Sequence, residues 1–234
     1  GPIEGRERVY YAMGKDEQFD HRVMEWVKVI RKKVRSGAHP PGEFLVLDHL
    51  LHEMRLIKSK AELELMRESG QIAVRAHKRA MQVCKAGMFE YEVEAEFMHE
   101  FFRSGCSAPA YTSIVAGGAN ACILHYNENN QRLNDGDLLL IDAGCEFEHY
   151  ASDITRTFPV NGRFSPEQKA IYELVLKAQL AAIDKVRPGN HWDEPHNTTV
   201  AVITEGLVEL GLLKGDVAQL IESGAYRDFY MHRA

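Results

Sequence analysis

The sequence lacks the features that mark several large classes of protein. Its 234 residues contain no apolar run that approaches the roughly 20 residues of a membrane-spanning helix, and no apolar signal-peptide core follows the N-terminus. Lys and Arg number 28 against 34 Asp and Glu, for a net charge of −6, whereas nucleic-acid-binding domains are usually basic. These absences predict a cytoplasmic protein that contacts neither membranes nor nucleic acids.

Cysteine is scarce and follows no pattern. The chain has four cysteines, and no two of them form a CxxC pair or another short metal-binding spacing. In a chain of this length we expect reduced thiols rather than a disulfide framework. The sequence also contains no GxSxG, Walker A, HExxH or GxGxxG motif. Its chemistry must therefore come from another arrangement of residues.

Helical spacing of apolar residues is present in both halves of the chain. Two predicted helix starts carry a capping box, formed by Ser59 with Glu62 and by Ser165 with Gln168. The apolar segment 43–52 fits either a strand or a helix. Helices are expected at 18–35, from 59 onward, at about 90–103, from 165 onward and at about 196–210.

The middle of the chain changes to short runs rich in Ile, Leu, Val, Tyr and Thr, separated by turn-forming residues. Such runs are typical of β-strands, and together with the helices they predict an α+β fold. The expected strands are 111–116, 122–126, 137–146 and 149–158, and 226–232 is expected to begin another.

One linker pattern occurs twice. Lys-Ala-Gly at 85–87 joins two predicted helices, Arg-Pro-Gly at 187–189 joins two more, and the second helix of each pair ends at a glycine, Gly105 or Gly211. One long period of this kind indicates duplication of an α+β unit. Helix–Gly–helix connections are common, so a chance similarity is the alternative.

Two aspartates interrupt the apolar runs of the central region. Asp142 lies within 137–146 and Asp153 within 149–158, and a carboxylate in an apolar strand is costly unless it has a partner. In a hairpin centred on 147–148, the two aspartates lie directly opposite each other, with Cβ atoms roughly 5 Å apart. Two buried carboxylates at that distance share a proton or bind a cation.

The spacing leaves the role of this pair open. Carboxylate and imidazole ligands favour Mn, Co, Fe or Zn, and a two-metal site holds its ions about 3.5–4 Å apart. The structural alternative is that Asp142 caps the turn at 143–144 and that Asp153 pairs with Arg156 or His149.

Two histidines lie in apolar runs of their own. His125 lies in the predicted strand 122–126, and His232 ends the run Phe229–His232. A histidine in such a setting is either a hydrogen-bonded core residue or a catalytic group, and both readings stay open. Six others are interpreted as surface or packing residues: His49, His52, His77, His99, His191 and His196.

The motifs around these residues resemble those of a known family. The segments Ile141–Cys145, Tyr150–Phe158 and Ile123–Tyr126 contain Asp142, Asp153 and His125. They closely resemble the Xaa-Pro aminopeptidases, the proline-specific members of the "pita-bread" metallopeptidases, and the similarity extends over essentially the whole chain.

The resemblance implies a pita-bread fold of two duplicated α+β halves around two divalent metal ions, most often Mn²⁺. Asp142 would match the ligand of one metal and Asp153 the ligand that bridges both. His125 and His232 would match catalytic histidines that steady the substrate or the tetrahedral intermediate.

The resemblance also implies a domain organisation. Residues 1–57 match the end of the family's N-terminal domain, and 58–234 match an incomplete catalytic domain, comprising the first half and the start of the second. One His and two Glu ligands of the family have no counterpart in the sequence. We therefore expect a chain truncated at both ends that is inactive by itself.

The activity implied for the whole protein is release of the N-terminal residue from peptides with a penultimate proline, by water activated between two metals. The implied whole protein is a homo-oligomer. Three alternatives remain. One is a prolidase that cleaves only Xaa-Pro dipeptides. Another is a metal-free hydrolase of the creatinase type, which retention of Asp142 and Asp153 disfavours. The last is a non-catalytic fragment or binding protein on the same fold.

Overall fold

Two folding units follow each other along the chain. The computed structural model describes residues 1–230, with residues 1–68 in one unit and the chain from Ser69 onward in the other. Helix α3 (Lys60–Val83) contains residues of both units. The assignment of 1–57 and 58–234 to two domains of the family stays a prediction. His232 lies outside the described residues.

The first unit is built around a parallel βαβ arrangement. Strand β1 pairs with β2, with Arg8 opposite Glu43, and α1 connects them. Val23, Val27 and Ile30 of α1 form the buried stripe of an amphipathic helix. The ambiguous segment 43–52 contains a strand followed by the start of a helix. The elements are β1 (Arg8–Tyr11), α1 (Glu17–Lys32), the 3₁₀ helix η1 (Val34–Ser36), β2 (Glu43–Val46) and α2 (Leu47–Leu56).

A helical hairpin and two small sheets form the centre of the second unit. The Ser59 capping box at the start of α3 is confirmed, because Ser59 N donates to Glu62 Oε2 (2.6 Å) and Glu62 N donates to Ser59 Oγ (3.3 Å). Gly87, with φ of 92°, turns the chain from α3 toward α4 (Glu90–Arg103). Such a left-handed conformation favours glycine.

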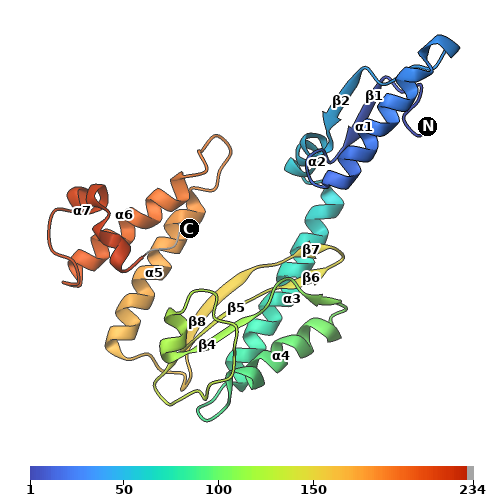
Figure 1. The fold of residues 1–234 in the computed structure, drawn as a ribbon. Helices are drawn as coiled ribbons and strands as arrows, with labels where there is room; N and C mark the ends of the chain where they lie inside the picture. Colours follow the sequence, from blue (N-terminus) through green and yellow to red (C-terminus); the bar gives the residue numbers. More distant parts are fainter. Residues whose placement is uncertain (231–234) are drawn as a thin grey trace. The chain divides into compact units, whose positions relative to one another are not determined.

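One sheet has the order β4-β5-β8 and the other the order β3-β6-β7, and every pairing in them is antiparallel. In β5, Leu139, Ile141 and Ala143 are buried on the face that α3 and α4 cover (Figure 1). The strands are β3 (Ala108–Pro109), β4 (Ile114–Gly117), β5 (Leu138–Ala143), β6 (Cys145–Phe147), β7 (Tyr150–Ala151) and β8 (Ile154–Pro159).

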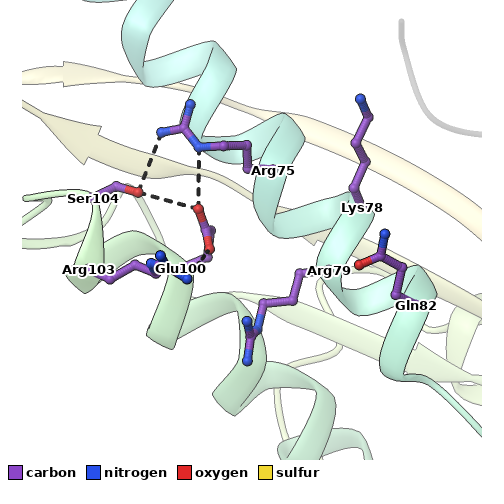
Figure 2. A pocket seen from close by; sticks show the side chains of 7 residues that line it. All are labelled: Arg75, Lys78, Arg79, Gln82, Glu100, Arg103 and Ser104. Atoms are coloured by element: carbon purple, nitrogen blue, oxygen red, sulfur yellow. Dashed lines mark hydrogen bonds and ion pairs between the residues drawn. The ribbon is translucent and has the colours of Figure 1, made fainter.

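Ion pairs also join α3 and α4. Arg75 Nε donates to Glu100 Oε1 at 3.3 Å, and the same guanidinium reaches Ser104 Oγ (Figure 2). Arg79 Nε donates to Glu96 Oε2 at 2.5 Å. These polar contacts lie outside the apolar seam between the helices, to which Ala76, Ala80 and Phe97 contribute.

The predicted strand 122–126 is wrong. The chain forms a 3₁₀ helix, η2 (Gly118–Cys122), and then a turn. His125 lies in this turn with φ of 55°. Ile123 and Leu124, whose apolar character suggested a strand, are 56% and 63% exposed.

The predicted hairpin pairing is wrong by two residues. Phe147 pairs with Tyr150, and Asp142 lies opposite Thr155 rather than Asp153. The turn consists of Glu148 and His149, with φ of 49° and 70°. Positive φ at both central residues is the pattern of a type I′ turn, which Asn-Gly normally signals. A shift of two residues keeps each side chain on its expected face.

A second helical hairpin follows β8. Its capping box is confirmed by Ser165 N donating to Gln168 Oε1 (2.9 Å) and Gln168 N donating to Ser165 Oγ (3.2 Å). Like Gly87 and Gly105, the glycines at 189 and 211 have positive φ, in agreement with the duplicated linker pattern. The elements are α5 (Pro166–Asp184), α6 (Glu194–Glu209), α7 (Val217–Ser223) and the 3₁₀ helix η3 (Ala225–Asp228).

Some remaining expectations can be compared with the described residues. The strand expected at 226–232 is wrong as far as residue 228, where the chain forms η3. All four cysteines are free thiols. Within residues 1–230, no helix has the length and apolar character that crossing a bilayer requires.

A glycine substitution tests the tightest backbone approach in the fold. A Cβ on Gly144 would lie 1.7 Å from Ser152 O, whereas a Cβ on Gly70 in α3 would meet nothing within 4 Å. We expect Gly144→Ala to lower the free energy of unfolding by about 3 kcal/mol or more. The matched Gly70→Ala change should raise it by about 0.5–1 kcal/mol. Urea unfolding measures both, and equal effects would contradict the close approach.

A buried histidine predicts a dependence of stability on pH. His77 Nε2 donates to Ile154 O at 2.9 Å, and burial lowers the pKa of His77 below its ordinary value of 6.5. The unfolded chain therefore binds a proton on His77 more readily, so stability is lost as the pH falls below about 6.5. His77→Gln should show a smaller difference in unfolding free energy between pH 7 and pH 5 than the unchanged chain. Equal differences would contradict this role.

Candidate metal centre

The two aspartates lie where the long hairpin changes from one sheet to the other. Gly144 separates β5 from β6, and on the returning strand Ser152 and Asp153 separate β7 from β8. At this junction Ala110 N donates to Gly144 O and Ser152 N donates to Cys145 O, both at 2.9 Å. The close backbone approach at Gly144 places the end of β5, with Asp142, beside the start of β8.

Tyr111 joins the two carboxylates. Its hydroxyl oxygen lies 2.5 Å from Asp142 Oδ1 and 2.9 Å from Asp153 Oδ1. Desolvation first, and then these two hydrogen bonds, raise the pKa of Tyr111 far above its usual range. The phenol therefore keeps its proton, which it can donate to one carboxylate at a time. The aspartates converge on one point, as expected, although they are not a directly opposed pair.

The expected burial of the pair is only partly correct. Asp142 is half-buried, and Asp153 is exposed. Within residues 1–230, Asp153 does not pair with Arg156 or His149, so this alternative is wrong. Arg156 donates to Thr155 O, and His149 Nδ1 lies 3.8 Å from Glu146 Oε1.

One hollow of about 380 Å³ brings three of the four predicted site residues together. Asp142 and Asp153 line it from the hairpin, and His125 lines it from the loop after η2. The sequence reasoning missed Tyr111, because a tyrosine in an apolar run has no motif or spacing of its own. The complete lining is Tyr111, Thr112, Ile114, His125, Asn127, Asp142 and Asp153.

The donor set fits a divalent metal in kind but not in number. Two converging carboxylates provide the hard oxygen ligands that Mg²⁺, Ca²⁺ and Mn²⁺ prefer. Among residues 1–230, however, no group of three or more His, Cys, Asp or Glu side chains could hold a metal ion. The described residues therefore supply part of a metal site, with Asp142 and Asp153 as its candidate ligands.

The comparison with protein families supplies the context for this partial site. Residues 64–234 match the family described as metallopeptidase family M24. The chain belongs to this family. A divalent metal is thereby implied, and the metallopeptidase prediction is confirmed at the level of the family.

Its relatives are named as aminopeptidases. The chain is 59% identical over 199 residues to "Xaa-Pro aminopeptidase" of Haemophilus influenzae, a match that covers 85% of this chain and 46% of the relative. It is similar to the structure of Pseudomonas aeruginosa aminopeptidase PepP, with 63% identity, a TM-score of 0.94 and coverage of 99% of this chain and 52% of the other.

A single-residue variant of Escherichia coli aminopeptidase P in complex with substrate is 45% identical, with a TM-score of 0.92 and coverage of 99% and 52%. A zinc-substituted form of the same enzyme is in complex with product. The chain thus spans about half the length of the relatives it matches. The expected α+β pita-bread fold and the resemblance to Xaa-Pro aminopeptidases are confirmed.

The incomplete donor set predicts weak metal binding by the 234-residue chain. Two carboxylates leave most coordination positions of a divalent ion to water. Calorimetric titration with Mn²⁺ should therefore give a dissociation constant weaker than micromolar, and Asp142→Asn should weaken it further. Submicromolar binding would show that the chain already contains a complete site.

Proposed function

We propose that this chain supplies part of the catalytic domain of a metal-dependent Xaa-Pro aminopeptidase. The observation that carries the proposal is the convergence of Asp142, Asp153 and His125 on one hollow in an M24 chain. The substrate would be a peptide with a penultimate proline, and the reaction would release its N-terminal residue. The similarity to the aminopeptidase P variant that binds substrate supports this choice.

The carboxylates would hold the metal ions. Asp142 would bind one ion and Asp153 would bridge two, with Mn²⁺ as the preferred metal because oxygen ligands suit it. Two bound divalent ions lower the pKa of a water molecule, so that a nucleophile is available near neutral pH. Until a cation is present, the Tyr111 hydroxyl reduces the repulsion between the carboxylates by donating its proton to one or the other of them.

His125 would act on the substrate. It lines the same hollow as the two carboxylates, and an imidazole N–H can donate to a peptide carbonyl oxygen as negative charge develops there. His232 is proposed for a similar role. Both histidines would steady the substrate or intermediate rather than bind metal.

The active protein would contain more chain than these 234 residues. The partial donor set is one reason, and the surface of α5 is a second. Val175, Leu180 and Ile183 of this helix are 52%, 59% and 59% exposed, and exposed apolar faces of this kind usually pack against other protein. We therefore propose that the 234-residue chain is inactive alone and that the whole protein is a homo-oligomer. A cytoplasmic location is proposed as well, supported by the four free cysteines.

An assay of the whole protein with added Mn²⁺ tests the proposed activity. Arg-Pro-Pro should be cleaved between Arg and Pro, and Asp153→Asn should abolish cleavage because the bridging ligand is lost. Asp135→Asn, which changes an exposed loop carboxylate bonded to Asn161, should leave the rate unchanged.

Two results would oppose the proposal. Cleavage of Arg-Pro without cleavage of Arg-Pro-Pro would favour a prolidase. Full activity of Asp153→Asn would remove the bridging role. A separate measurement addresses the metal-free hydrolase of the creatinase type, because stoichiometric metal binding by the whole protein would exclude that alternative.

A further inference from the structure

A buried carboxylate outside the candidate metal centre accepts its four side-chain hydrogen bonds from one loop, residues 117–131, which begins at the last residue of β4. Glu90, in the first turn of α4, is fully buried. Its Oε1 accepts from Gly117 N (2.8 Å) and Asn120 Nδ2 (2.9 Å). Its Oε2 accepts from Tyr126 OH (2.7 Å) and Gln131 N (2.9 Å). The four donors extend from the beginning of the loop to its end.

The chemistry of these contacts suits a carboxylate and no other side chain of similar size. Two of the donors are backbone N–H groups and one is an amide N–H, and none of these can accept a hydrogen bond. A glutamine at 90 would direct its own NH₂ group at two of the four donors. A charge buried without partners is very costly, whereas one that accepts four hydrogen bonds is compensated.

The loop held in this way carries His125 to the candidate metal centre. His125 directly precedes Tyr126 and has φ of 55°, a conformation uncommon in residues other than glycine, which the surroundings must therefore maintain. Tyr126 is buried, and its hydroxyl donates a hydrogen bond to Glu90. Desolvation first, and this hydrogen bond second, raise the pKa of the phenol to about 12. The neutral phenol remains a donor to Glu90.

We infer that Glu90 is a positioning residue, which holds Tyr126 and thereby places His125 beside Asp142 and Asp153. The catalytic consequence rests on the proposed function, because it requires His125 to act on substrate. The placement of the loop does not depend on that function.

A second anchor allows this inference to be tested without unfolding the loop. Asn129 Oδ1 accepts from Val115 N at 3.0 Å, and its Nδ2 donates to Ser113 O at 2.9 Å and to Glu94 Oε2 at 3.0 Å. These contacts tie the later part of the loop to β4 and α4 independently of Glu90. Loss of the Tyr126 hydroxyl therefore removes one attachment of the His125 region while Asn129 keeps the loop in place.

Tyr126→Phe is the principal variant, because it removes little volume and only two hydrogen bonds, the one donated to Glu90 and the one accepted from Asn120 Nδ2 (3.1 Å). Glu90→Gln is the second variant. Glu100→Gln is the matched control, since Glu100 is a buried carboxylate of the same helix whose partners are Arg75, Arg103 and Ser104 rather than the loop. All three are made in the whole protein with Mn²⁺, and thermal unfolding identifies the temperature at which each is folded.

Kinetics on Arg-Pro-Pro distinguish positioning from stability. Displacement of a catalytic group by about 1 Å can cost on the order of 100-fold in rate. We expect Tyr126→Phe to lower kcat about 10- to 100-fold with a smaller change in KM, and Glu100→Gln to keep the full kcat. In a His125→Ala background, Tyr126→Phe should cause no further loss. A further loss equal to that in the unchanged protein would overturn the inference.

Hydrogen exchange tests the placement of the loop separately from activity. Tyr126→Phe and Glu90→Gln should accelerate amide exchange within residues 118–128 and leave α3 unchanged, whereas Glu100→Gln should leave the loop unchanged. Unaltered exchange in the loop for both variants would overturn the role of Glu90. If the unchanged protein cleaves no Xaa-Pro peptide, the proposed function fails, and the exchange experiment still decides whether Glu90 holds the loop.

Discussion

The contact between the backbones of Gly144 and Ser152 is the constraint on which the candidate site depends. A Cβ at 144 would lie 1.7 Å from Ser152 O, so the two strands can pass this closely only because residue 144 has no side chain. The passage divides one long hairpin between two sheets, with β5 and β8 on one side and β6 and β7 on the other. Asp142 and Asp153 lie at this division, at the end of β5 and just before β8.

Glu90 differs from Asp142 and Asp153 in the number of hydrogen bonds that its carboxylate accepts. This difference distinguishes a structural carboxylate from candidate metal ligands. Glu90 accepts four hydrogen bonds and has little capacity left for a further partner. Asp142 and Asp153 share the single proton of Tyr111. Like charges that converge on one point favour a cation or a proton between them. The aspartate pair, which accepts fewer hydrogen bonds than Glu90, is therefore the one suited to metal binding. The saturated carboxylate acts on it indirectly, through the loop that carries His125.

The chain belongs to metallopeptidase family M24 and spans about half the length of its relatives. Its candidate metal centre is likewise only part of a metal site. The described residues bring together two candidate ligands, one histidine and one tyrosine, which is a recognisable part of a metal centre. The apolar surface of α5 likewise has the character of an interface rather than of an outer face. Chemistry and packing both support the proposal that further protein surrounds this partial metal site.

Local patterns in the sequence were sufficient for much of this fold. The capping boxes at Ser59 and Ser165 begin helices as predicted, because a cap depends on residues three positions apart. The alternation of the strands placed Asp142 and Asp153 on a shared face, since a register shift of two preserves the face. The motifs around them were sufficient to identify the family.

Only the tertiary structure decided the details of the site. The turn at Glu148 and His149 set the register through positive φ values that neither residue type signals. His125 lies in a loop rather than in the predicted strand. Glu90 holds this loop through Tyr126, which is 36 residues away in the sequence. Tyr111 reached two aspartates that lie 31 and 42 residues away. Each of these outcomes depends on hydrogen bonds between distant segments, and no local pattern of residues records them.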